Sequence, residues 1–214
     1  MKFARRSFVS AIFALGAMCT VAFPAAAQTA GKDYTMISPA QPADDASKIE
    51  VVEFFGYFCP HCRDAHPALQ AWAAKLPADV VLKKVPVSFG RQQLVPWQRL
   101  YYTLEVTGDL ARLDTVAFKA AQDDRLVLVS DADALAWAKA NGVDAKKFSE
   151  AWSSFGVTSK VQRAGQLERA YKVSGVPAIA VDGKYMTGDM DFNQKLVLAD
   201  KLIAKARAER SSKK

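Results

Sequence analysis

Residues 49–62 read IEVVEFFGYFCPHC and combine a buried strand with a cysteine pair. The run from Ile49 to Phe55 is apolar apart from acidic interruptions such as Glu53, a pattern typical of a central strand buried on both faces. A Cys-x-x-Cys pair follows at once. The pattern after it predicts a helix from about Cys59 to Lys75, which Leu76-Pro77 ends.

The cysteine pair has the spacing of a disulfide that forms and breaks. Two intervening residues bring both sulfurs within one helical turn, inside disulfide range. Cys59 lies at the helix N-terminus, where free N–H groups and the helix dipole favour a thiolate. We therefore predict that Cys59 is the attacking thiol and Cys62 the resolving one. Pro60 suits the first helical turn, because its missing N–H costs little there.

His61 is the predicted tuning residue. Its side chain can donate a hydrogen bond to the Cys59 thiolate or carry charge beside it. A stabilised thiolate stabilises the reduced state, which makes the disulfide a stronger oxidant. We also expect the reduced protein to be more stable than the oxidised protein at pH 7, which requires a Cys59 pKa below about 5.6.

Two structural roles for the cysteine pair are less favoured. A disulfide across so short a loop constrains the unfolded chain little. A zinc site needs further ligands, and after the first 27 residues the chain offers only His61 and His66. We predict neither a metal nor a cofactor, and we expect His66 to be a helix-surface residue rather than a catalyst.

The regions beyond the cysteine pair predict an α/β fold with an inserted helical block. Val80 to Val87 reads as a second strand, whereas helical periodicity runs from about 94 to 173. Strand character returns at Pro177 to Val181, and Asp182-Gly183 predicts a hairpin turn into a short further strand. The predicted organisation is one unit over residues 28–214, with the helical insertion at about 94–173.

Helix ends can be placed at several points of this block. Ser130 to Asp133 predicts a helix cap, and Asn141-Gly142 predicts the end of that helix. Residues 28–48, polar with scattered prolines, read as a lead-in to the first predicted strand. The later helices are predicted over 147–155, 160–171 and about 192–206.

Glu53 is an unusual residue for a buried strand. A buried carboxylate must be paired with a cation or protonated. Lys83 and Lys84, in the neighbouring predicted strand, are the candidate partners. Such a pair either tunes proton movement near Cys62, which we favour, or is a structural ion pair.

Residues 1–27 have the parts of a secretory signal: a basic start, an apolar run from Phe8 to Phe23 and the small residues Ala25-Ala26-Ala27. We predict cleavage after Ala27. An uncleaved membrane anchor and, because of Arg5-Arg6, a twin-arginine signal remain as alternatives.

Cleavage would change both the charge and the cysteine count. It lowers the net charge from +7 to +4 and removes Cys19, so that Cys59 and Cys62 are the two cysteines left. A lipoprotein anchor at Cys19 is disfavoured, because Met18 precedes it where such sites need a small residue. The mild charge, without a basic patch interleaved with aromatics, argues against nucleic-acid binding.

A second motif, Ser174-Gly175-Val176-Pro177, precedes the returning strand. From the residue pattern by itself a trans Val176–Pro177 bond is expected, since only about one X-Pro bond in twenty is cis. Together with residues 53–62 and with Asp182 to Tyr185, this motif resembles the DsbA family of periplasmic disulfide-donating enzymes, and Ala151 to Phe155 adds to the resemblance.

The resemblance carries its own expectations. It implies a thioredoxin-like fold, a cis Val176–Pro177 bond packed against the active-site sulfurs, and a Val176 backbone that pairs with substrate peptide. It implies a hydrophobic groove beside the site, favours Lys84 as the partner of Glu53, and names a quinone-linked membrane oxidase, DsbB, as the partner that reoxidises the enzyme. His66 stands where some family members carry an acid, so a less acidic surface is expected there.

These observations together predict a monomeric periplasmic oxidase that donates its Cys59–Cys62 disulfide to unfolded exported proteins with free thiols. A disulfide isomerase or a thioredoxin-like reductase is the first alternative, although only about twenty residues separate the signal from the first strand, too few for an isomerase's dimerisation domain. The second alternative is a holdase-like peptide-binding protein without redox chemistry.

Overall fold

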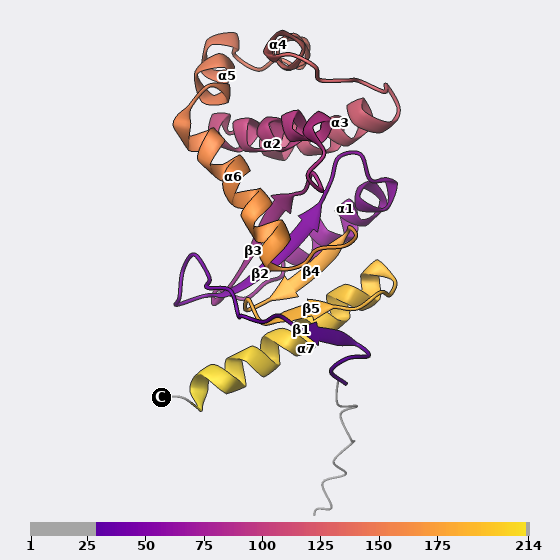
Figure 1. Cartoon of the computed structure of the whole chain (residues 1–214), viewed down its shortest axis with the longest axis vertical. Coiled ribbons are helices and arrows are strands. Elements are labelled where there is room, and N and C mark those ends of the chain that lie inside the picture. The colour runs from indigo at the N-terminus through magenta and orange to yellow at the C-terminus, as the bar shows by residue number, and fades with distance from the viewer. Residues whose placement is uncertain (1–28, 213–214) are drawn as a thin grey trace, which may run out of the picture.

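A computed structural model describes residues 29–212 of the chain, so the predicted signal lies outside the described residues. One five-stranded sheet of order β1-β5-β4-β2-β3 forms the centre of the molecule (Figure 1). Strand β2 (Ile49–Phe55) lies inside the sheet between β4 and β3, and it is buried along its whole length as the sequence predicts. No helix within residues 29–212 combines the length and apolarity that a membrane crossing needs.

The register of the sheet brings Glu53 and Lys84 together. Strand β2 runs parallel to the edge strand β3 (Val80–Pro86) and pairs Glu53 with Lys84. On its other side β2 runs antiparallel to β4 (Ala178–Val181), with Glu53 opposite Ile179. The other lysine, Lys83, contacts Asp44 and lies 3.8 Å from Glu50, a second buried acid of β2.

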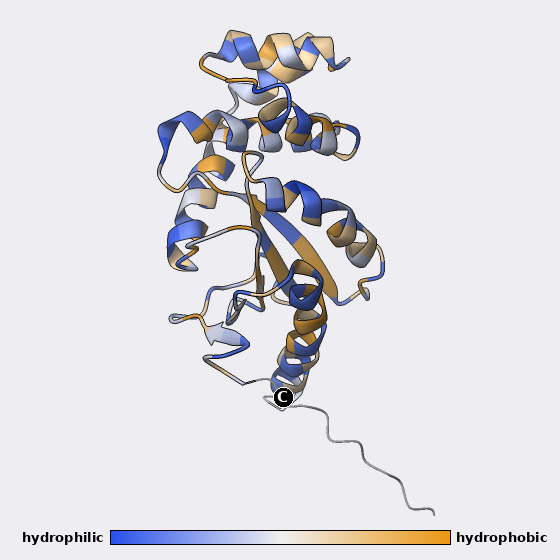
Figure 2. Cartoon of the chain, turned by 90° about the vertical axis from the view of Figure 1, so that its right-hand side faces the viewer, coloured by the Kyte–Doolittle hydropathy of each residue, from blue (hydrophilic) through white to orange (hydrophobic). Residues whose placement is uncertain are grey.

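Helix α1 (Pro60–Ala73) starts at the cysteine pair and packs against one face of the sheet with α7 (Phe192–Ser211). Leu69 of α1 and Leu202 of α7 lie in the apolar core of that face. Helix α7 extends five residues past the predicted end at Ala206, and Arg210 in this extension pairs with Asp182. In Figure 2 the long strands of the sheet are coloured largely hydrophobic, and the helices around them carry both hydrophobic and hydrophilic residues.

A helical block lies between β3 and β4 and covers the other end of the sheet (Figure 1). Its aromatic residues share one core with β2, where Phe54 packs on Tyr171 and Phe55 on Phe118. The predicted cap at Ser130 is found as a capping box with Asp133. The elements of the block are η1 (Gln92–Leu94), α2 (Val95–Thr107), α3 (Leu110–Gln122), α4 (Asp131–Ala140), α5 (Ala145–Trp152) and α6 (Phe155–Ala170).

Two local predictions were wrong. The helix predicted over 147–155 ends at Trp152, because the Ser154 hydroxyl accepts the backbone N–H of Val157 and so starts α6. The lead-in contains strand β1 (Tyr34–Met36), an edge strand of three residues paired with β5 (Tyr185–Thr187). A strand of three residues is too short to show an alternation of apolar and polar residues. The polar residues on either side of it make it harder still to recognise in the sequence.

The Asp182-Gly183 turn between β4 and β5 has positive φ at both residues, 55° and 64°, as the hairpin prediction requires. A side chain at Gly183 would also collide with the backbone of Gln41, which passes close to the turn.

Candidate active site

Cys59 is the N-cap of α1, and its sulfur accepts a hydrogen bond from the backbone N–H of Cys62 at 3.4 Å. Both cysteines are free thiols, and Cys62 is the less exposed, at 1% against 8% for Cys59. Pro60 takes the first helical position, as predicted. A side chain at Gly56, just before the helix, would overlap the ring of Phe58 unless that ring moved.

The two thiols differ in their pKa values. The pKa of Cys59 falls to about 6, chiefly because the Cys62 thiol donates a hydrogen bond to it, with backbone N–H groups of Cys62 and His61 adding to the effect. Burial opposes this shift. The pKa of Cys62 is raised strongly, because its proton is held by that hydrogen bond and the thiol is buried. A thiolate therefore forms at Cys59 first.

His61 is exposed and lines the cavity beside the cysteines. Its charge lowers the pKa of Cys59, but it is the smallest of the causes named, and the backbone N–H of His61 contributes more. The charge of His61 thus adds less to the lowered pKa of Cys59 than the Cys62 thiol and the backbone N–H groups at the start of α1 do.

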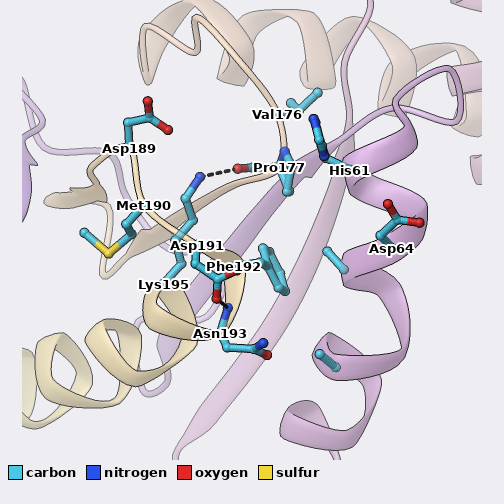
Figure 3. A pocket seen from close by; sticks show the side chains of 12 residues that line it. His61, Asp64, Val176, Pro177, Asp189, Met190, Asp191, Phe192, Asn193 and Lys195 are labelled. Atoms are coloured by element: carbon cyan, nitrogen blue, oxygen red, sulfur yellow. Dashed lines mark hydrogen bonds between the residues drawn. The ribbon is translucent and has the colours of Figure 1, made fainter.

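Val176 and Pro177 reach the cysteines from the loop before β4. The Val176–Pro177 bond is cis, as the resemblance implies and against the expectation from the residue pattern by itself. The Cys59 thiol donates a hydrogen bond to the Val176 carbonyl at 3.4 Å. Lys195 of α7 donates to the carbonyl of Pro177 at 2.8 Å (Figure 3). Lys195 was not predicted as a site residue, because its place on a helix with many polar residues carries no local signal.

A cavity of about 410 Å³ lies between α1 and the start of α7, next to His61 and Pro177. Figure 3 shows Phe192 facing the α1 side, with Asp64 on α1 and Asp189 on the loop before α7. The resemblance implies a hydrophobic groove in this region. The cavity has apolar walls at Ala65, Met190 and Phe192, but its rim is acidic.

Behind the cysteines lies a buried cluster of charged and polar groups. Lys84 is 3.8 Å from the carboxylate of Glu53 and 2.7 Å from that of Asp114, which also accepts a hydrogen bond from the Tyr57 hydroxyl at 2.7 Å. Burial raises the pKa of Glu53 to about 7, and the charge of Lys84 only partly offsets it. The geometry of the predicted Glu53–Lys84 pair is present, with Asp114 as an unpredicted third member.

His66 belongs to this cluster, and its predicted place on the helix surface was wrong. The side chain is buried, with its ring 3.5 Å from the Lys84 ammonium and 3.7 Å from Asp114. The expectation of a less acidic surface therefore fails, because this position does not face solvent. Burial and the Lys84 charge lower the pKa of His66.

Asp114 could have been found from the sequence. It lies on the apolar stripe of α3 that Leu113, Ala117 and Phe118 form, and an acid on such a stripe indicates a buried partner. Within residues 29–212 no group of three or more histidine, cysteine or acidic side chains is arranged to bind a metal ion.

A thiolate-forming Cys-x-x-Cys pair at a helix start, opposite a cis-proline and on a mixed sheet of this order, defines a thioredoxin-fold thiol-disulfide oxidoreductase. The family described as DSBA-like thioredoxin domain matches residues 50–197. The chain belongs to this family, and the predicted fold class and enzyme class are confirmed.

Relatives and solved structures agree. A thiol:disulfide interchange protein DsbA of Bordetella parapertussis is 39% identical over 206 residues, covering 94% of this chain and 98% of the relative. The crystal structure of Pseudomonas aeruginosa DsbA has a TM-score of 0.81 at 35% identity, covering 87% of this chain and 97% of that one. The oxidoreductase DsbA from Xylella fastidiosa has a TM-score of 0.78 at 33% identity, with coverage of 85% and 98%.

Proposed function

We propose that the protein is a monomeric periplasmic oxidase that donates its Cys59–Cys62 disulfide to exported proteins carrying free thiols. Residues 1–27 would be the export signal, removed after Ala27. The observation that carries the proposal is the unequal pair: Cys59 has a lowered pKa at a helix N-terminus, whereas Cys62 is buried with a raised pKa.

The reaction follows from this inequality. A substrate thiolate attacks the Cys59 sulfur of the disulfide, the S–S bond breaks, and Cys62 leaves and takes up a proton. A second substrate thiolate attacks the substrate sulfur of the mixed disulfide, and Cys59 leaves as a stabilised thiolate. The substrate loses two electrons and gains a disulfide, and the enzyme is left as the dithiol.

The surrounding residues have supporting roles in this proposal. The backbone of Val176 binds extended substrate peptide beside Cys59, and the cavity between α1 and α7 takes the neighbouring side chains. Glu53, paired with Lys84, exchanges a proton with Cys62, whose pKa it raises. Reoxidation requires a disulfide donor of more oxidising potential, and family membership supports the quinone-linked partner DsbB. The reaction needs neither metal nor nucleotide.

The test is disulfide transfer to a reduced, unfolded protein. The oxidised enzyme should oxidise it stoichiometrically in the absence of glutathione, and Cys59→Ser should not. In a glutathione buffer the enzyme should equilibrate largely as the dithiol under conditions that keep a thioredoxin-like reductase oxidised. An enzyme that leaves the substrate thiols reduced and stays largely oxidised in that glutathione buffer is a reductase, and the proposal would then be wrong.

A further inference from the structure

Lys84 has two possible counter-ions in the buried cluster and sits closer to one of them. Its ammonium nitrogen is 2.7 Å from Asp114 Oδ2 and 3.8 Å from Glu53 Oε2. Glu53 is 1% exposed, and its Oε2 atom has no hydrogen-bond partner among the described residues. Glu53, whose charge acts on the Cys62 thiol, is therefore the carboxylate with the longer distance to the Lys84 ammonium.

Asp114 is held firmly enough to act as the competing partner. It is 4% exposed, and the Tyr57 hydroxyl binds its other oxygen, Oδ1, at 2.7 Å. Lys84 is in turn confined by its neighbours, with its ammonium 4.5 Å from the centre of the Phe55 ring and 3.5 Å from His66 Nδ1. These contacts fix the ammonium on the Asp114 side.

We infer that Asp114 is a positioning residue for the redox centre: its carboxylate holds the Lys84 ammonium away from Glu53, which leaves Glu53 with a buried carboxyl group able to exchange a proton with Cys62. The helical block, through α3, thus sets the proton chemistry of a site built on β2 and α1. The inference deepens the proposed function and rests on it for its catalytic consequence.

The charges around Glu53 predict the direction in which its pKa changes when Asp114 is replaced. The charge of Asp114 raises the pKa of Glu53 and that of Lys84 lowers it. Replacing Asp114 by a neutral side chain removes the first effect and frees Lys84 to strengthen the second, so both changes lower the pKa of Glu53. Besides Lys84 and Asp114, the titratable groups near Glu53 are Tyr57, Cys59, Cys62, His66 and Tyr101.

The consequence appears when Cys62 resolves a mixed disulfide. Its thiol gives a proton to the ionised Glu53 carboxylate, its sulfur attacks the Cys59 sulfur, and the bound thiol leaves as a thiolate. The rate of this step should rise with pH through the pKa of Glu53. In Asp114→Asn the rise should begin at lower pH.

The experiment follows the Glu53 carboxyl carbon by NMR across pH in the reduced full-length mature protein. Asp114→Asn should lower the Glu53 pKa by about one unit or more. The matched control is Asp123→Asn, which removes an exposed acid at the end of the same helix, where it pairs with Arg63, and should leave the Glu53 pKa unchanged. The release of glutathione from a Cys59–glutathione disulfide should shift its pH midpoint by the same amount as the carboxyl titration.

An unchanged or raised Glu53 pKa in Asp114→Asn would overturn the inference. If that variant does not fold, Tyr57→Phe decides: Asp114 then depends more on Lys84, so the Glu53 pKa should not fall, and a fall would overturn the inference. The two ideas fail separately. A protein that exchanges no disulfide refutes the proposed function, while the carboxyl titration still decides the role of Asp114.

Discussion

The sulfur of Cys59 and the backbone oxygen of Val176 lie 3.4 Å apart, although 117 positions separate the two residues. A protonated Cys59 can donate to this oxygen, whereas a thiolate cannot. Ionisation of Cys59 therefore releases the Val176 carbonyl, at the edge where substrate peptide is proposed to bind. The hydrogen bond from the Cys62 thiol then becomes the main side-chain support of the thiolate.

Removing that donor should raise the pKa of Cys59. We expect Cys62→Ala to raise it by about one unit, or about 1.4 kcal/mol of thiolate stabilisation. Cys62→Ser keeps a hydroxyl donor and should raise it less. The ultraviolet absorbance of the thiolate, followed across pH in both variants, measures the difference. A Cys59 pKa in Cys62→Ala that equals that of the unaltered protein would show that the Cys62 side chain does not hold the thiolate.

His61 offers a separate test of the charge effect. His61→Leu should raise the Cys59 pKa by less than one unit, because the backbone N–H of residue 61 is retained, and should make the redox potential more reducing by less than about 30 mV. His61→Lys keeps a positive charge and should hold the pKa low. Equilibration with glutathione gives the redox potentials of both variants. A shift of the His61→Leu potential by more than about 30 mV would mean that the imidazole stabilises the Cys59 thiolate more than the backbone N–H groups do.

The sequence is most informative about this protein where local patterns coincide with the fold. The apolar run of β2, the cysteine spacing and the Asp182-Gly183 turn each determine their own structure through short-range rules. The burial of His66 and the edge strand β1 depend on segments far along the chain, such as α3 for His66 and β5 for β1. No local pattern around either one contains that information.

The cis bond at Pro177 could be predicted neither from a local pattern nor from the contacts of a distant segment. Its residue pattern favours trans, and the resemblance of the surrounding motif, rather than any local rule, gave the right expectation. Likewise the register that pairs Glu53 with Lys84 rather than Lys83 follows from a parallel strand pairing that neither strand specifies by itself.

The oxidised and reduced forms should have equal free energies of unfolding at a pH near neutrality. Closing a loop of about four residues stabilises the oxidised form by about 1.9 kcal/mol. A Cys59 pKa of about 6 in the folded state, against about 8.5 unfolded, stabilises the reduced form by about 1.4 kcal/mol at pH 7. This pKa is close to the limit of about 5.6, so the two contributions nearly balance at pH 7, and the greater stability of the reduced form at that pH stays a prediction.

Because the folded pKa is depressed, this stabilisation is fully present above the unfolded pKa and is lost as the pH falls towards 6. We expect the oxidised form to be more stable at about pH 6 and the reduced form more stable at about pH 8. Urea melts of both forms between about pH 6 and 8 locate the crossing. A stability difference that does not change with pH would contradict the titration of Cys59 that the account requires.

The division of labour between Cys59 and Cys62 is the central claim, and trapping tests it most directly. In cells that export thiol-containing proteins, Cys62→Ser should accumulate mixed disulfides between Cys59 and those proteins, because the resolving thiol is gone and the attacking one is intact. Cys59→Ser should accumulate none, because Cys62 is buried with a raised pKa. Non-reducing gels show the conjugates, and equal trapping by the two variants, or trapping by Cys59→Ser only, would contradict the account.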